Sequence, residues 1–203
     1  QRHATEAHLP TVGDEAAHRV DERRLAGAVR ADQADDAAGL DRQAHLVERV
    51  DAAEMLHNLV KFHSSTAPAG VKLNIIGCDK AIVIRADRDQ LNRVFTNLIK
   101  NAVEAMPDGG DLTVSAVKTE GGAVFRFRDT GVGMTAEQLE RIFTPYFTSK
   151  SGGTGLGLSI ARRILADHGA RIEASGAPGK GAEFAVAFGD QTAAETGGSG
   201  LER

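Results

Sequence analysis

The chain lacks most of the features on which several classes of protein depend. Its 203 residues include one cysteine, Cys78, one tyrosine and no tryptophan. A single cysteine excludes an intramolecular disulfide and a metal site built from several cysteines. The longest aliphatic cluster, residues 82–84, is far shorter than the roughly 20 apolar residues of a membrane-spanning helix, and no signal-peptide pattern is visible. The 24 basic and 28 acidic residues give no basic excess for nucleic acid. These absences predict a cytoplasmic chain with no membrane segment and no nucleic-acid partner.

What the sequence does contain divides into two parts near residue 60. Residues 1–57 have no Lys, Ser, Asn, Ile, Phe or Tyr, and they carry 12 acidic against 7 basic residues. Leu46, Val50, Leu56 and Val60 recur at helical spacing and give one apolar stripe. We therefore predict that residues 1–66 are helical and partly disordered.

Residues 67–189 mix strand and helix patterns. Asp87, with Gln90 three residues later, matches a capping box at the start of a helix, and Pro107 ends that helix. Strands joined as hairpins and mixed with helices favour an α+β fold, in which an antiparallel or mixed sheet lies beneath helices. The polar residues 190–203 are predicted to be a disordered tail. The expected elements are strands at 72–76, 81–85, 112–117, 123–128, 171–174 and 183–188, and helices at 88–106 and 156–168.

Two clusters in this part carry polar groups suited to a nucleotide. Asn97 and Asn101 are four residues apart and share one helix face, where a carboxamide oxygen can coordinate Mg²⁺. Two surface asparagines are the alternative interpretation. Asp129 follows a strand and can accept the amino hydrogens of an adenine, while Gly131 and Gly133 allow close backbone approach. A strand-to-helix turn capped by the aspartate is the alternative there.

Two further clusters follow. Phe143 and Phe147 either anchor the root of a loop or are ordinary core aromatics, and Lys150 can reach phosphate as a mobile charge. Residues 152–159 place glycines at the opening of a helix, where backbone amides form an anion site. This spacing matches neither a dinucleotide fingerprint nor a Walker A loop.

The four clusters, in this order and with these gaps, resemble the N, G1, F and G2 boxes of the ATP-binding domain of two-component sensor histidine kinases. The resemblance covers residues 85–188, and residues 143–159 look most like nitrogen-regulation-type kinases. It implies a two-layer α/β sandwich over 67–189, shared with gyrase-type, chaperone and mismatch-repair ATPases. Residues 44–66 look like the second helix of a dimerisation hairpin, which makes 1–66 a degenerate dimerisation and phosphoacceptor-like region.

The resemblance also implies ATP and Mg²⁺ as cofactors. Asn101 would hold the metal, Asn97 would support it, and Lys100 lies close enough to help. Asp129 would recognise the adenine amino group, and residues 148–157 would form a lid over the triphosphate. The nucleotide contacts implied in this way are Asn97, Lys100, Asn101, Asp129, Gly131, Gly133, Lys150, Thr154, Gly155, Leu156 and Gly157.

One residue bears on the type of reaction. The hydrolysing branches of the superfamily carry a glutamate, as general base for water, four residues before the metal-binding asparagine. Asn97 occupies that position here. An amide cannot take a proton, so ATP hydrolysis is disfavoured, whereas transfer to a positioned nucleophile depends mainly on geometry and electrostatics.

The phosphoacceptor is harder to assign. In the family the acceptor histidine lies in a His-Glu/Asp-x-x-x-Pro context, which none of the seven histidines has; His3 and His8 are the candidates within the chain. The leading hypothesis is the catalytic core of a homodimeric sensor histidine kinase, which phosphorylates a histidine and then a response-regulator aspartate. Its parent protein can be membrane-anchored. The alternatives are a kinase-derived ATP-binding or interaction module that does not autophosphorylate, and an anti-sigma-type serine kinase, which residues 44–66 oppose.

Overall fold

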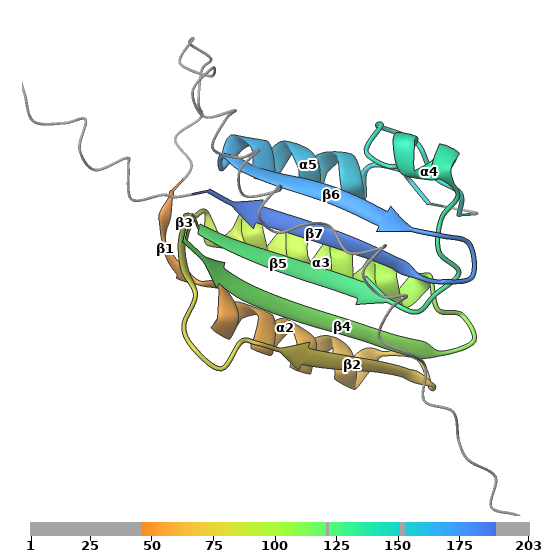
Figure 1. Ribbon diagram of the computed structural model, residues 1–203, viewed down its shortest axis with the longest axis horizontal. Coiled ribbons are helices and arrows are strands. Elements are labelled where there is room, and N and C mark those ends of the chain that lie inside the picture. Colours follow the sequence, from red (N-terminus) through yellow and green to blue (C-terminus); the bar gives the residue numbers. More distant parts are fainter. Residues whose placement is uncertain (1–45, 121, 151–152, 190–203) are drawn as a thin grey trace, which may run out of the picture.

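The computed structural model describes residues 46–120, 122–150 and 153–189. Its main feature is a five-stranded sheet in the order β2-β4-β5-β7-β6, with helices α2, α3 and α5 packed on one face (Figure 1). The strands of this sheet are β2 (Val71–Ile76), β4 (Gly110–Thr119), β5 (Gly122–Asp129), β6 (Ala170–Gly176) and β7 (Ala182–Phe188). The helices are α2 (Ala52–Thr66), α3 (Arg88–Glu104), α4 (Ala136–Arg141) and α5 (Gly157–Asp167).

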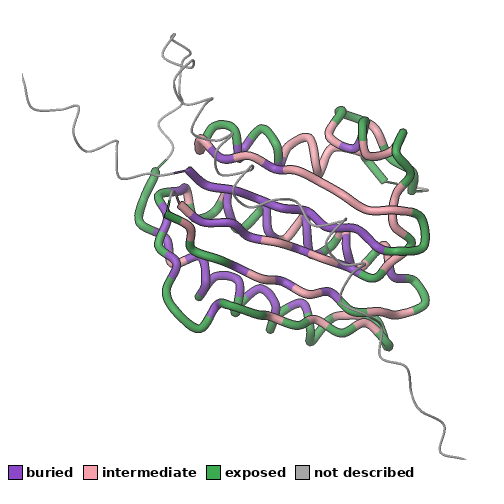
Figure 2. Tube along the Cα trace, in the orientation of Figure 1, coloured by how far each residue is buried: buried purple, intermediate pink, exposed green. Residues whose placement is uncertain are grey.

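The sheet is mixed. β2 pairs parallel to β4, and the remaining neighbours pair antiparallel. Alternate residues of β4, β5 and β7 point toward the helices, so that the rings of Phe125 and Phe127 lie 5.4 Å from the ring of Phe95 on α3. Figure 2 shows the buried positions along β7 and along the side of α3 that faces it. The predicted α+β fold, two layers with a mixed sheet beneath helices, is confirmed.

Helix α3 begins where the sequence predicted. The carboxylate of Asp87 accepts a hydrogen bond from the backbone N–H of Gln90 at 3.0 Å, which satisfies one of the free donors of the first turn. Leu91, Val94 and Leu98 lie on the buried side of the helix. This stripe fixes the rotation of α3, so Asn97 and Asn101 lie at its half-buried margin.

The predicted helix over 44–66 is wrong at its beginning. Glu48–Asp51 forms strand β1, which pairs antiparallel with β3 (Val83–Ala86). Asp51 explains the change, because its Oδ1 accepts from the N–H groups of Ala53 and Glu54 and so caps α2, and also from the N–H of Ile82 beside β3. The helix therefore starts at residue 52, after the strand.

The apolar stripe of α2 packs against the domain's own sheet. Met55, Leu56 and Val60 belong to the same buried core as the strands. Within the described residues, α2 therefore shares a core with the strands that follow it, while Phe62 on the same helix is exposed; the boundary expected between residues 66 and 67 stays a prediction. The earlier part of that region, including His3 and His8, and the predicted tail 190–203 lie outside the described residues.

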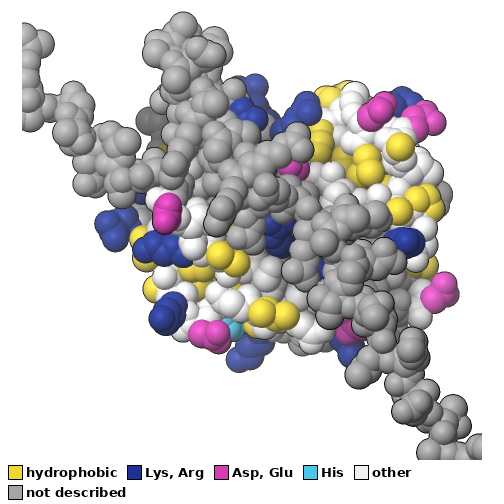
Figure 3. All heavy atoms as spheres, in the orientation of Figure 1, with side chains coloured by type: hydrophobic (Ala, Val, Ile, Leu, Met, Phe, Trp, Pro, Cys, Tyr) yellow, Lys and Arg dark blue, Asp and Glu magenta, His cyan; other side chains and the backbone are white. Residues whose placement is uncertain are grey.

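The two-stranded ribbon of β1 and β3 closes one end of the sandwich. Val50 and Ile84 point inward and are buried, whereas Arg49 and Arg85 lie opposite each other on the exposed side. Figure 3 shows Lys and Arg side chains gathered at this end. Within the described ranges, no helix has both the length and the apolar character needed to cross a membrane.

Candidate functional site

Asp129 is the most deeply buried acidic side chain of the site. It ends β5, is 2% exposed, and accepts hydrogen bonds from the N–H groups of Gly131 at 2.9 Å and Ala182 at 3.2 Å. Both bonds end on Oδ1, which leaves Oδ2 to accept from a ligand. Burial raises the pKa of this carboxyl, although the two backbone hydrogen bonds and the charge of Lys150 oppose the rise. The arrangement provides a fixed acceptor of the kind that recognises an amino group.

The loop after Asp129 is held on both sides. The N–H of Val132 donates to the carbonyl of Ala105 at 3.0 Å, and the N–H of Gly179 donates to the carbonyl of Val132 at 2.8 Å. A side chain at Gly131 would collide with the Ala105 carbonyl, and one at Gly133, whose φ is +67°, would collide with backbone from the turn between β6 and β7. Both glycines are therefore required by close backbone approach. The sequence predicts the segment between β6 and β7 only as the turn of a hairpin. The structure shows that this turn also supports the loop after Asp129.

The two asparagines of α3 lie beside the start of α5. Asn97 Nδ2 is 3.5 Å from the carbonyl oxygen of Gly157, and its carboxamide would be 3.8 Å from a side-chain carbon placed at that glycine. Asn101, four residues further along α3, is half-buried and shares this side of the helix. One amide oxygen completed by phosphate and water suits Mg²⁺, which keeps several non-protein ligands. The described part of the chain has no cluster of three His, Cys, Asp or Glu side chains placed for a metal.

Lys100 lies on the exposed side of α3. Burial, and secondly the nearby charge of Lys100, lower the pKa of His63 on α2. Lys100 is thus close to α2, and its predicted part in nucleotide binding remains a prediction.

A backbone contact joins Tyr146, which precedes the predicted lid of residues 148–157, to Gly155 near the end of that lid. The N–H of Tyr146 donates to the carbonyl of Gly155 at 3.0 Å, and both residues have a φ of +65°. A side chain at Gly155 would collide with the Tyr146 backbone. Positive φ in a tyrosine is uncommon and costs energy, and the close contact with Gly155 holds the Tyr146 backbone in this conformation. Two further residues predicted to contact the nucleotide lie next to Gly155 in the sequence. Thr154 is exposed, and Leu156 is half-buried.

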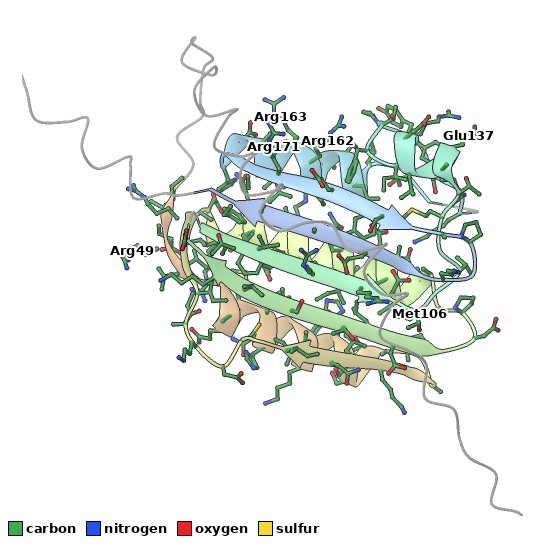
Figure 4. All side chains as sticks on the ribbon, in the orientation of Figure 1. Arg49, Met106, Glu137, Arg162, Arg163 and Arg171 are labelled. Carbon is green, nitrogen blue, oxygen red and sulfur yellow. The ribbon has the colours of Figure 1, made fainter. Side chains whose placement is uncertain are left out.

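The aromatic cluster anchors this segment. Phe143 and Phe147 pack against the main core. This position fits both predicted interpretations, an anchor for the root of a loop and ordinary core aromatics. The guanidinium of Arg141 lies 4.8 Å from the ring centre of Phe147, and that of Arg162 lies 5.7 Å from that of Phe143. Figure 4 labels Arg162 on α5 and Glu137 on α4.

Lys150 makes a contact that the sequence did not predict. Its Nζ lies 2.5 Å from Oε2 of Glu104 in the last turn of α3. Glu104 follows Asn101 by three residues, so it shares that helix face, and this spacing was the available signal. The pair places a carboxylate close to where phosphates are expected.

Glu104→Gln should therefore strengthen ATP binding by about 1.4- to fivefold, because an exposed pair of this kind is worth only about 0.2–1 kcal/mol. The substitution removes negative charge and frees Lys150. Titration calorimetry at low and high salt measures the effect, which should shrink as salt increases. Glu137→Gln is the control, because Glu137 pairs at 3.4 Å with Arg141 on its own helix. Weaker binding by Glu104→Gln would contradict this interpretation.

Known proteins similar to this chain include several kinases. The chain is 42% identical over 146 residues to sensor histidine kinase ZraS of Klebsiella oxytoca, an alignment that covers 70% of this chain and 32% of that protein. It is 45% identical over 104 residues to sporulation kinase C of Bacillus subtilis, covering 51% and 24%. The chain thus spans about a third or less of the length of these relatives.

Solved structures share the fold. The catalytic domain of histidine kinase ThkA superposes with a TM-score of 0.65 at 25% identity, over 71% of this chain and 95% of that one. Full-length ShkA in complex with AMPPNP gives 0.64 at 28% identity, over 74% and 32%. The family model for "Histidine kinase-, DNA gyrase B-, and HSP90-like ATPase" matches residues 86–192, more than half of the chain. The chain therefore belongs to the family of histidine kinase-, DNA gyrase B- and HSP90-like ATPases.

Proposed function

We propose that this chain is the ATP-binding catalytic part of a sensor histidine kinase. In this proposal it binds Mg-ATP and transfers the γ-phosphoryl group to a histidine of a dimeric helical domain, from which the group passes to an aspartate of a response regulator. The buried Asp129 carboxylate, with one oxygen held by two backbone N–H groups and the other free for a ligand, carries the proposal. The names of the relatives, sensor histidine kinase and sporulation kinase, support it.

Each part of the nucleotide has a proposed partner. Oδ2 of Asp129 would accept from the adenine amino group, with Gly131 and Gly133 keeping the loop close to the base. Asn101 would hold Mg²⁺, which supplies neutralising charge at the phosphates, and Asn97 would keep the start of α5 against this edge. The amides at the beginning of α5 and the ammonium of Lys150 would contact the phosphate oxygens. A structural neighbour in complex with AMPPNP is consistent with a nucleotide in this position.

Asn97 favours transfer over hydrolysis. Its carboxamide cannot act as a base toward water, and its Nδ2 points toward the Gly157 carbonyl. Transfer to a histidine requires chiefly that the imidazole be positioned in line with the γ-phosphate. Since the proposal needs an acceptor, His3 and His8 stay as candidates within this chain, and a histidine of a separate helical domain is the other source.

Incubation with γ-labelled Mg-ATP, combined with titration calorimetry, tests this proposal. We expect binding of Mg-ATP together with phosphate that is labile in acid and stable in base, as in phosphohistidine; His3→Gln and His8→Gln then locate it. Binding without label indicates the nucleotide-binding module that does not autophosphorylate. Acid-stable label transferred to an added protein serine indicates the serine kinase. Failure of the wild-type chain to bind ATP would refute the proposal altogether.

A further inference from the structure

His168, the residue after α5, joins two helices through its ring. Its Nε2 lies 2.9 Å from the backbone nitrogen of Asp87, and its Nδ1 lies 2.7 Å from the carbonyl oxygen of Ile164. A backbone N–H can only donate and a carbonyl can only accept. The ring is therefore neutral, with its proton on Nδ1, and Nε2 accepts from Asp87. With both nitrogens engaged, His168 is not available as a nucleophile toward phosphate.

The partner of His168 is the residue that starts α3. Asp87 caps the helix with its carboxylate, and its carbonyl accepts from the N–H of Leu91 at 2.9 Å. Its remaining backbone polar group, the N–H, donates to Nε2 of His168. A side chain from the end of α5 thus holds the beginning of α3.

Helices α3 and α5 are joined at a second point. Asn97 Nδ2 lies 3.5 Å from the carbonyl of Gly157, the first residue of α5. The end of α5 meets the start of α3, and the start of α5 meets the middle of α3, so the helices run antiparallel (Figure 1). Eleven residues separate the two attachments of α5, a length of about 16 Å.

We infer that His168 is a positioning residue for the phosphate end of the nucleotide site. By fixing α5 against α3, it sets the distance between the amides at the start of α5 and the asparagines of α3. Asp129 and its loop are held by β5, by the turn between β6 and β7 and, through Val132, by Ala105 at the opposite end of α3 from Asp87, so the base end of the site depends less on this attachment. The inference rests on the proposed function, because that function assigns one end of the site to the phosphates and the other end to the base.

The test compares adenosine with Mg-ATP as ligands of the full chain, by titration calorimetry at a temperature where circular dichroism shows each variant folded. His168→Leu should weaken Mg-ATP binding by about tenfold, because small misplacements of binding groups are costly, and should leave adenosine binding within about twofold. His168→Gln should restore most of the loss, since a carboxamide can accept from Asp87 and donate to Ile164.

Arg163→Leu is the matched control, because Arg163 points outward on the same helix (Figure 4) and pairs with Asp167 one turn away. If His168→Leu does not fold, His168→Asn replaces it, since the shorter carboxamide can reach Ile164 but not Asp87. Equal losses for adenosine and Mg-ATP, or no loss for Mg-ATP, would overturn the inference. Should the wild-type chain bind neither ligand, the proposed function itself fails, which is a separate result.

Discussion

Asp129→Asn should severely weaken ATP binding without loosening the fold. The carboxamide oxygen can keep both hydrogen bonds that Oδ1 accepts from Gly131 and Ala182, so the loop stays in place. The amide nitrogen then replaces Oδ2 and presents hydrogens to the adenine amino group, which also donates. Two donors facing each other in a buried site should weaken binding by at least about 100-fold.

The same substitution should raise stability at neutral pH. Burial raises the pKa of Asp129 above its ordinary value of 3.8, so the native state holds its proton more tightly than the unfolded chain. The contribution of this carboxyl to stability is therefore most favourable below 3.8 and declines as pH rises through the raised native pKa. Asparagine does not titrate, so the advantage of Asp129→Asn should grow over that window and then level off.

Urea unfolding from about pH 4 to about pH 8 measures this difference, and calorimetry with ATP and with inosine triphosphate measures recognition. Inosine carries an oxygen where adenine carries its amino group, so the preference for ATP should shrink or reverse in Asp129→Asn. Asp79→Asn, on the exposed loop before β3, is the control. A folded Asp129→Asn protein with wild-type ATP affinity would disprove the assigned role.

Leu56→Ala should lower the free energy of unfolding by about 2–5 kcal/mol, a large part of the roughly 5–15 kcal/mol that holds a typical domain together. Leu56 lies on α2 and is completely buried in the common core. Its removal leaves a cavity between the helix and the sheet. Because the contact lies within one chain, the loss should be the same at every protein concentration.

Urea denaturation at several concentrations checks this expectation. Lys61→Ala, an exposed change on the same helix, should alter stability by no more than about 0.5 kcal/mol. A helix whose stripe were covered by a second subunit would instead give stability that rises with protein concentration. That outcome, or a loss below about 1 kcal/mol for Leu56→Ala, would show that α2 is not part of the core.

The elements that the sequence predicted well carry their signals locally. The start of α3 depends on Asp87 and Gln90, three residues apart, and its buried stripe repeats over a few turns. The two hairpins, β4 with β5 and β6 with β7, also join neighbouring segments. Such short-range patterns fix both element type and the two-layer arrangement.

What the sequence missed depends on distant partners. Strand β1 has four residues and exists because β3, more than thirty positions later, pairs with it. Taken alone, its one apolar residue, Val50, continues the helical stripe of α2. Helix α4, with its capping box of Thr135 and Gln138, was not predicted, since it buries no residue and so shows no apolar stripe. The attachment of His168 to Asp87 spans 81 positions. At the candidate site, the sequence motifs identified the side chains, whose roles remain proposals. They did not identify the backbone groups that hold those side chains in place.

The place of β7 in the sheet affects how the domain is made. β7 is the last strand in the sequence, yet it lies between β5 and β6 and supplies the Ala182 N–H that holds Asp129. A growing chain on the ribosome has Asp129 in place more than fifty residues before this donor is synthesised. The proposed base pocket can therefore be completed only after β7 has been synthesised, and a chain that stops before residue 182 lacks the Ala182 donor. Under the proposed function, nucleotide binding would therefore begin only once translation has passed the last strand of the sheet.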